Sequence, residues 1–563
     1  MQLVAYGAQD VYLTGNPQIT FFKVVYKRHT NFSMEPIEQT FNGNADFGQS
    51  PHVHITRNGD LITKMYLRAD IPAICLNNPE DGCRREIHQA AWVRKLGHAL
   101  IKSVEIQIGG SRIDKHYGNW LNIWYELTHE VGLEDGYAKM IGDVPELSAL
   151  SKANSAGVMK NKYTVYVPLQ FWFCRNNGLA LPLIALQYHE VRVYFEFRNK
   201  QELLVHNGAL KEYTIEGLGN VSLLVDYIYL DTEERRRFAQ VSHEYLIEQL
   251  QTTGEDSITS NNYKGRLNFN HPSKALFWGL RQGSYRVGKK FIAYNPFDWD
   301  AALKEAAEKL IVGQYDMDEC GVFENNDTCT SEKYSVEESV FTVDKDSGSL
   351  KGDDCVTICK LPDTEKYFVL KDNTDLRSKV SGNVVVYQDG DGNVRLHHVN
   401  IVRNDLTIED LSNCVETIDD NRNGWIRNQD VCVRQHDNYG NNIDGTGNPV
   451  SEAQLKLNGH DRFDKLDGNY FNYVQPYQHF HNTPVDGINV YSFALKPCEH
   501  QPSGAANFSR IDTTELNMDF SRVVDGVERF RDLNSTETKV EIFTVNYNVL
   551  RIMSGMGGLA YSN

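Results

Sequence analysis

The chain has 563 residues, with 57 basic and 75 acidic side chains and 41% hydrophobic residues, a composition typical of globular proteins rather than disordered or fibrous ones. A single hydrophobic core rarely grows beyond about 300 residues, so this length requires at least two cores. The net charge of −18 argues against a nucleic-acid-binding protein, because such proteins displace phosphate counterions with clustered Lys and Arg.

The N-terminal segment has neither a basic region nor an apolar stretch of the kind found in secretory signals. No window reaches the roughly 18 consecutive apolar residues that a membrane span needs, and the most apolar run, 179–186, is much shorter. We therefore expect the chain to be made and kept in an aqueous, cytoplasmic compartment.

Short β-branched and aromatic runs, separated by Gly, Pro and Asn, occur through most of the chain, as in all-β sandwiches and barrels. In Val191–Phe197 the odd-numbered residues are all apolar and share one face, whereas Arg192 and Glu196 lie on the other, so one face is expected to be buried. The sequence predicts strands at 19–26, 52–56, 102–108, 163–169, 191–197, 221–230, 266–270, 275–280 and 540–549.

Near the middle of the chain, Asp231 and Glu234 form the start of a helix resembling a capping box. Apolar residues then follow at helical spacing, at positions 238, 241, 245, 246 and 250, so the sequence predicts a helix that continues to about residue 251. This helix is expected to connect two β domains, with Arg235, Arg236 and Arg237 on a solvated or interdomain face.

An acidic segment covers residues 298–450, which contain 31 Asp and Glu against 15 Lys and Arg, so this segment carries −16 and the rest of the chain only −2. It also holds six of the ten cysteines and several Asn- and Gly-rich turns, and a helix is predicted at 301–310. We interpret it as a solvated insertion in a host β domain, although a third, consecutive domain is the alternative.

One motif within the acidic segment matches the calcium-binding EF-hand loop, and it follows a helix-like stretch at 406–418. The candidate ligands are Asp419, Asn421, Asn423, Trp425 through its backbone carbonyl, and Asp430, with Gly424 at the position of the sharp turn. The twelfth residue is Asp rather than the bidentate Glu and no clear helix follows, so an Asn- and Gly-rich turn is the alternative, and any calcium affinity should be weak.

Other candidate sites have simpler structural explanations. The run 389–393 lies between two β-like runs and is predicted to be a hairpin turn rather than a metal loop. The pairs His52/His54 and His479/His481 would each share one face of a strand, but neither has an identifiable third metal ligand, which favours core or interface histidines. The cysteines lack CxxC spacing and are expected to be free buried thiols, and Gly555–Gly558 is expected to be a flexible tail.

Three long segments resemble the major capsid protein of nucleocytoplasmic large DNA viruses: Gln2–Phe32, which opens QLVAYGAQDVYLTGNPQITFF; Asn469–Leu495, which reads NYFNYVQPYQHFHNTPVDGINVYSFAL; and the ending Asn548–Asn563. The resemblance extends over residues 1–297 and 455–563 and does not cover the acidic segment in detail. It implies an all-β fold of two consecutive eight-stranded antiparallel jelly rolls.

The resemblance also implies a division of the chain. It places an N-terminal arm at 1–19, the first jelly roll at 20–228, a linker helix at 229–251 and the second jelly roll at 252–563, interrupted by the 298–450 insertion. By the same resemblance the insertion would be a surface tower that points away from the viral interior.

The function implied is structural: trimeric pseudo-hexagonal capsomers that tile the icosahedral shell of a large double-stranded DNA virus, with no enzymatic activity and no cofactor. The implied partners are two further copies in a homotrimer, neighbouring capsomers, and minor capsid and penton proteins, with an internal viral membrane nearby and no direct contact with nucleic acid. The alternative is a β-sandwich carbohydrate-binding protein or glycosidase whose insertion binds calcium; the missing secretory signal weighs against it.

Overall fold

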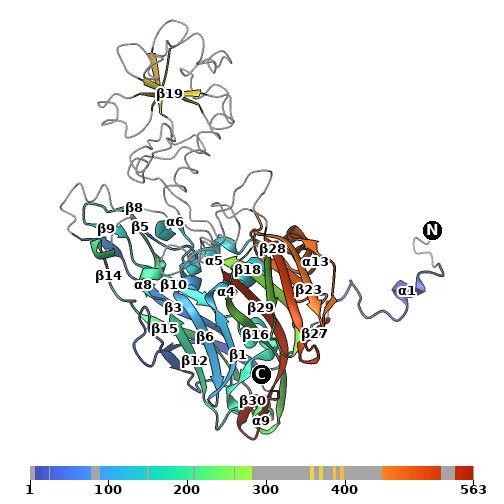
Figure 1. The fold of residues 1–563 in the computed structure, drawn as a ribbon. Coiled ribbons are helices and arrows are strands. Elements are labelled where there is room, and N and C mark those ends of the chain that lie inside the picture. The colour runs from blue at the N-terminus through green and yellow to red at the C-terminus, as the bar shows by residue number, and fades with distance from the viewer. Residues whose placement is uncertain are drawn as a thin grey trace, which may run out of the picture.

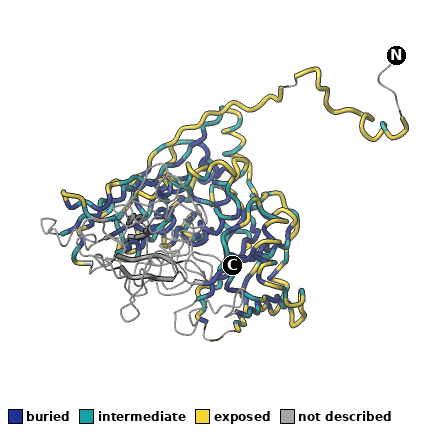
Figure 2. The backbone as a smooth tube through the Cα atoms, turned by 90° about the horizontal axis from the view of Figure 1, so that it is seen from above, coloured by how far each residue is buried: buried dark blue, intermediate teal, exposed yellow. Residues whose placement is uncertain are grey.

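The computed structural model describes residues 7–24, 26–77, 89–148, 151–206, 210–258, 260, 262–281, 447–520 and 539–561, and four strands between 356 and 398. Two β-sandwiches stand side by side in this part of the chain (Figure 1). Seen from above, buried backbone occupies the interior of both, whereas one segment at the N-terminus extends away from them and is exposed (Figure 2).

The first sandwich has two main sheets, with the strand orders β1-β15-β3-β10 and β2-β12-β6-β7. Their strands are β1 (Phe32–Thr40), β2 (His52–His54), β3 (Leu61–Ile71), β6 (Ile101–Ile108), β7 (Ser111–Tyr117), β10 (Tyr163–Pro168), β12 (Val191–Phe197) and β15 (Val221–Leu230), with β11 (Leu181–Pro182) beside β3. In β12 the odd-numbered residues are buried, which confirms the alternation predicted from the sequence.

The second sandwich again has two main sheets, with the orders β16-β29-β18-β26 and β17-β28-β23-β24. Its strands are β16 (His243–Ser257), β17 (Asn262–Arg266), β18 (Pro272–Arg281), β23 (Val450–Leu457), β24 (His460–Asp461), β26 (Asn489–Ser492), β28 (Thr514–Phe520) and β29 (Lys539–Met553). Short strands β25 (Leu466–Asp467), β27 (Ala506–Asn507) and β30 (Met556–Leu559) pair with β23, β18 and β29.

Both sandwiches have the same topology. If the eight main strands of each are counted in chain order, one sheet has the order 1-8-3-6 and the other the order 2-7-4-5, in the first sandwich and again in the second. All of these pairs are antiparallel. This is the jelly-roll arrangement, so the chain is an all-β double jelly roll, as predicted.

Smaller elements are inserted between the main strands of the first jelly roll. Two three-stranded sheets have the orders β13-β5-β8 and β14-β4-β9, from β4 (Ile74–Leu76), β5 (Gln89–Trp92), β8 (Ser151–Lys152), β9 (Val158–Lys160), β13 (Leu204–His206) and β14 (Tyr213–Ile215). The helices here are α3 (Leu96–Leu100), α4 (Gly118–Thr128), α5 (Glu134–Ile141), α6 (Pro145–Ser148), α7 (Trp172–Arg175) and α8 (Lys200–Leu203). In the described part of the chain no helix is long and apolar enough to span a membrane.

The predicted linker helix is shorter than expected. Helix α9 runs only from Thr232 to Gln240, and the side chain of Asp231 accepts a hydrogen bond from the Glu234 backbone amide, so the predicted N-cap is confirmed. The expected continuation to residue 251 was wrong, because residues 243–257 form β16 and pair with β29. A helix there would leave the long strand β29 without its neighbour on that side.

Arg235 joins this helix to the first jelly roll, since its guanidinium lies 3.0 Å from the carboxylate of Asp60, which is almost fully buried. The Asp60 carboxylate also accepts a hydrogen bond from the Leu230 backbone amide at the end of β15. The interdomain role considered for the arginine run is therefore seen at Arg235.

Two predicted strands are absent from their expected places. Residues 19–26 form no strand where the structure describes them, and their apolar side chains lie in solvent. The strand expected at 266–270 lies earlier, as β17 at 262–266. In both cases the residues have strand propensity, but propensity becomes a strand only where a partner strand lies alongside.

The acidic segment falls between the third and fourth main strands of the second jelly roll, since β18 ends at Arg281 and β23 begins at Val450. Between Arg281 and residue 447 the structure describes only two antiparallel hairpins, β19 (Val356–Lys360) with β20 (Tyr367–Lys371), and β21 (Val384–Gln388) with β22 (Val394–His398). The second confirms the hairpin predicted around 389–393. The helices predicted at 301–310 and 406–418 lie outside the described residues.

Candidate functional site

The contact between the two jelly rolls has an aromatic centre. Helix α4 of the first jelly roll places the buried Trp120 against two strands of the second jelly roll. The centroid of its ring lies 5.0 Å from the ring centroid of Phe277 on β18 and 5.7 Å from that of Phe543 on β29. Gly118 allows α4 to begin here, because a β-carbon at that position would lie 2.3 Å from the carbonyl oxygen of His98. The largest hydrophobic cluster therefore includes residues of both jelly rolls.

Buried hydrogen bonds supplement this apolar contact. The side-chain amide of Asn119 donates to both carboxylate oxygens of Glu541, at 3.0 and 2.8 Å. The backbone amide of Leu250 donates to the carboxylate of Asp114 at 3.0 Å, and the side chain of Gln249 donates to the carbonyl of Ile113. Because polar groups buried without partners are costly, these pairings fix how the two jelly rolls are placed.

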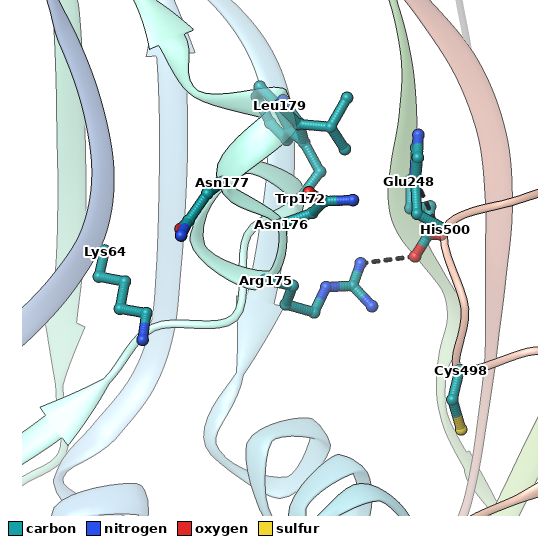
Figure 3. A pocket seen from close by; sticks show the side chains of 9 residues that line it. All are labelled: Lys64, Trp172, Arg175, Asn176, Asn177, Leu179, Glu248, Cys498 and His500. Atoms are coloured by element: carbon teal, nitrogen blue, oxygen red, sulfur yellow. Dashed lines mark ion pairs between the residues drawn. The ribbon is translucent and has the colours of Figure 1, made fainter. Parts of the chain in front are cut away.

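An ion cluster lies beside the aromatic contact. Glu248 on β16 is 2.8 Å from Arg175, the last residue of α7 in the first jelly roll (Figure 3). The same carboxylate is 2.6 Å from Lys274 on β18. His500 lies 3.6 Å from the same carboxylate. The side chains of Glu248 and Lys274 are only 4% and 1% exposed, so this is a buried cluster whose central acid joins cations from both jelly rolls.

The electrostatics of this cluster follow from burial and charge together. Burial by itself would raise the pKa of Glu248, but the positive charge of Arg175 and the hydrogen bonds from His500 and Lys274 lower that pKa to about 2. Burial lowers the pKa of Lys274, and the Glu248 carboxylate opposes that shift. The Lys274 ammonium also donates to the carbonyl of Glu499 at 3.1 Å and lies over the ring of Tyr547.

A cavity of about 370 Å³ opens beside the cluster, and Figure 3 labels the nine side chains that line it. Its walls come from the first jelly roll, including α7, and from β16 and the loop of Cys498 and His500 in the second. Burial raises the pKa of the Cys498 thiol to about 12, so the thiol there is neutral. Glu248, the carboxylate that lines the cavity, is engaged by Arg175 and Lys274.

The C-terminal segment makes a further contact between the jelly rolls. Residues 556–559, which were expected to belong to a flexible tail, form β30 and pair with β29 through a turn at Ser554 and Gly555, both at positive φ. The carbonyl of Gly555 accepts a hydrogen bond from the Tyr188 backbone amide at 3.0 Å. The expectation of a flexible tail was wrong because the hairpin packs on the first jelly roll, which the local sequence does not indicate.

The structure does not describe the calcium ligands that the sequence predicts. These are Asp419, Asn421, Asn423, Trp425 and Asp430. Elsewhere, the part of the chain that the structure describes holds no group of three His, Cys, Asp or Glu side chains placed to bind a metal ion. The calcium loop therefore stays a prediction.

The two histidine pairs have different surroundings. His52 and His54 lie on β2, where His52 stacks on Tyr194 and His54 is 3.4 Å from Glu190. His479 ends α13 (Gln475–His479), preceded by the single π-helical turn of Tyr470–Val474, so the expectation that it shares a strand face with His481 was wrong. His479 contacts the carbonyl of Leu495, and the backbone amide of His481 donates to the carbonyl of Leu127 in the first jelly roll.

Sequence reasoning did not find the ion cluster. Its members come from positions 175, 248, 274 and 500, and no spacing rule connects residues so far apart. A weak signal was present, because Lys274 directly precedes the apolar run Ala275–Leu280, where an ion needs a partner to be buried. Of the cysteines that the structure describes, Cys174 is a buried free thiol, whereas Cys75 and Cys498 are half-buried.

Comparison with known proteins gives consistent matches over the whole chain. The family model described as "Major capsid protein N-terminus" matches residues 20–231, and the one described as "Large eukaryotic DNA virus major capsid protein" matches residues 234–558. "Capsid protein 1" of Acanthamoeba polyphaga mimivirus is 47% identical, with 100% of this chain and 99% of the relative covered. The major capsid protein of Paramecium bursaria Chlorella virus 1 is 34% identical, with the same coverage.

Solved structures agree with the sequence matches. A quasi-atomic structure of the PBCV-1 virus capsid aligns with a TM-score of 0.58 and 30% identity, over 97% of this chain and 100% of that one. The Faustovirus major capsid protein aligns with a TM-score of 0.55 over 97% of this chain and 94% of that one, at 12% identity, which shows similarity of fold alone.

Proposed function

The chain belongs to the family of large eukaryotic DNA virus major capsid proteins, and on this premise we propose that three copies assemble into a pseudo-hexagonal capsomer that tiles an icosahedral shell. It is a structural protein of the capsid shell, like its relatives. Family membership weighs against a carbohydrate-binding protein or glycosidase.

The repeated topology is the observation that carries the trimer proposal. Each chain contains two jelly rolls with the same strand order, fixed side by side by a buried contact. Three such chains around a threefold axis present six similar sandwiches, and a nearly sixfold outline can pack in a hexagonal lattice through repeated contacts. Rigidity between the two jelly rolls matters here, because a hinge would let the outline vary from one copy to the next.

We further propose that the protein works through its surfaces and has no enzymatic activity. The junction cavity supports this, since its carboxylate, Glu248, is paired with Arg175 in a structural ion cluster. The further partners proposed are neighbouring capsomers and minor capsid and penton proteins, with an internal viral membrane nearby and no direct contact with nucleic acid. The protein is proposed to be synthesised in the host cytoplasm.

No cofactor is proposed for the jelly rolls. Weak calcium binding at 419–430 is testable by titrating Ca²⁺ into the protein and into an Asp419→Asn variant.

Light scattering on the purified protein, followed by negative-stain imaging of the same peak, tests the trimer. Three chains of 64.2 kDa give about 193 kDa, and the expected images are hexagonal tiles. A chain that stays near 64 kDa at high concentration would contradict the proposed self-assembly. An assay for turnover of soluble glycans addresses the remaining alternative, and we expect neither activity nor saturable binding.

A further inference from the structure

The segment that precedes β1, residues 7–31, is called the arm from here on and extends beyond the N-terminal arm predicted at 1–19. It has the composition of a binding segment. Eight of its large apolar side chains are each more than 60% exposed, namely Val11, Tyr12, Leu13, Ile19, Phe21, Phe22, Val24 and Tyr26. Disordered tails are poor in aromatic and β-branched residues, whereas the arm is rich in both. Contiguous exposed apolar surface of this kind marks a site of interaction with another molecule.

The described residues of the arm form no hydrogen bond to the jelly rolls of their own chain. Among the described residues, the hydrogen bonds of the arm stay within it, such as those from Leu13 to Asp10 and from Gly15 to Val11 around the short helix α1 (Val11–Thr14). Both views show it extending away from the sandwiches rather than folding back on them (Figures 1 and 2). Its apolar side chains therefore have no partner among the described residues of this chain.

The arm continues into a strand whose outer edge is also unpaired. Among the described strands, β1 is the edge strand of its sheet and pairs with β15 alone, so its other row of backbone groups is open to a partner. Phe32 and Met34 at the start of β1 are each about half exposed. Arm and edge strand thus form one continuous surface of the kind that binds another chain by adding to a sheet edge.

The length of the arm and the direction in which it leaves the sandwiches indicate which partner it fits. The 25 residues of the arm can span up to about 80 Å when extended, whereas a compact chain of this length has a radius of gyration of about 24 Å. The arm is therefore long enough to cross a neighbouring subunit. In Figure 1 it leaves the side of the sandwiches, across the strand direction, and not the end where α9 and β30 lie. In a shell built of this protein, the neighbour to the side is another copy.

We propose that the arm binds a second copy of this chain, with Phe21 and Phe22, which are 89% and 99% exposed, as its central anchors. Aromatic anchors of this kind dominate the energetics of protein interfaces. This inference rests on the proposed function and adds to it the segment that holds neighbouring copies together. A lipid surface is the competing partner, since Lys23, Lys27 and Arg28 make the arm basic.

The test compares the wild type with two double variants, Phe21→Ser/Phe22→Ser and the matched control Phe21→Leu/Phe22→Leu, which keeps apolar side chains. Trimer formation is measured by sedimentation velocity and the growth of sheets of trimers by imaging. We expect the Ser variant to weaken association of copies at least tenfold, about 1.4 kcal/mol, and the Leu variant to stay within about threefold of the wild type. Since the arm lies outside both jelly rolls, neither change should disturb folding.

A photoreactive benzoylphenylalanine in place of Phe22 provides a second measurement. Covalent dimers of the chain after irradiation are expected. Wild-type trimers together with an unchanged Ser variant in both association assays, or crosslinks confined to single chains, would overturn the arm proposal and leave the proposed function standing. A wild type that stays monomeric would contradict both. Arm-dependent binding to phosphatidylserine vesicles, with association of copies unchanged, would assign the arm to a lipid surface instead.

Discussion

The contact between the two jelly rolls and the N-terminal arm are both rich in aromatic and charged side chains, but in the described part of the chain only the contact finds its partners. At the contact, Trp120 is buried against Phe277 and Phe543, and Glu248 is paired with Arg175 and Lys274. In the arm, Phe21 and Phe22 lie in solvent. One surface is therefore complete in a single copy, whereas the other becomes complete only by assembly.

Breaking the ion cluster should have the largest effect on stability. Glu248→Gln leaves Arg175 and Lys274 without their shared counter-charge in a buried site, so the free energy of unfolding should fall by about 3–5 kcal/mol. The measurement is denaturant unfolding at one protein concentration. Glu244→Gln on the same strand is the matched control, because its ion pair with Arg551 is half exposed and should contribute about 0–1 kcal/mol. Equal effects of the two changes would contradict a structural role for the cluster.

Lowering the pH should weaken the ion cluster around Glu248. The pKa of Glu248 is about 2 in the folded protein against an ordinary 4.5, so the unfolded chain takes up the proton first as the pH falls. The stabilising contribution is fully present above about pH 5 and should be lost between about pH 5 and 2, on the order of 3 kcal/mol. Unfolding curves at several pH values measure this loss. If Glu248→Gln retains the full wild-type slope in this range, other carboxylates cause it.

The linker helix α9 should show an intermediate effect, since it is exposed over much of its surface but anchored at its first residue. Asp231→Ala removes the side chain that accepts from the Glu234 amide, and should cost about 1 kcal/mol. Asp231→Asn keeps an acceptor and is the control. Thermal unfolding of both variants distinguishes the cap from a general effect of charge.

Removal of the arm should have the smallest effect on the single chain. Deletion of residues 1–30 is expected to change the free energy of unfolding by less than about 0.5 kcal/mol, because the described arm makes no bond to the sandwiches. The same deletion should impair association of copies. A large loss of stability at a concentration where the protein is monomeric would show that the arm completes its own jelly rolls.

Strand prediction succeeded where alternation and local partners agreed. The limits of β12 and β15 match the runs at 191–197 and 221–230, because each carries a clear apolar face that the sandwich buries. The run at 19–26 also has strand propensity but has no neighbouring strand among the described residues, so it forms no strand and its apolar side chains are exposed. Propensity alone did not distinguish the two cases.

The candidate site was less predictable than the fold. The proposed calcium ligands came from a local motif, whereas the ion cluster at the junction joins four positions spread over 325 residues. Local motifs are visible in sequence because their spacing is fixed by one turn or loop. Contacts between sheets are fixed by topology, which brings β16 and β18 beside α7 in the folded molecule.

By itself, the sequence determined the all-β class and the acidic segment, because alternation, charge and turn residues are local properties of the chain. The double jelly roll followed from the resemblance of three long segments to a known family. Only the tertiary structure decided where α9 ends, what the C-terminal hairpin contacts, and that the arm has no partner among the described residues. These outcomes depend on pairings such as His243 with Ile552, in which a strand is stabilised by residues about 300 positions away.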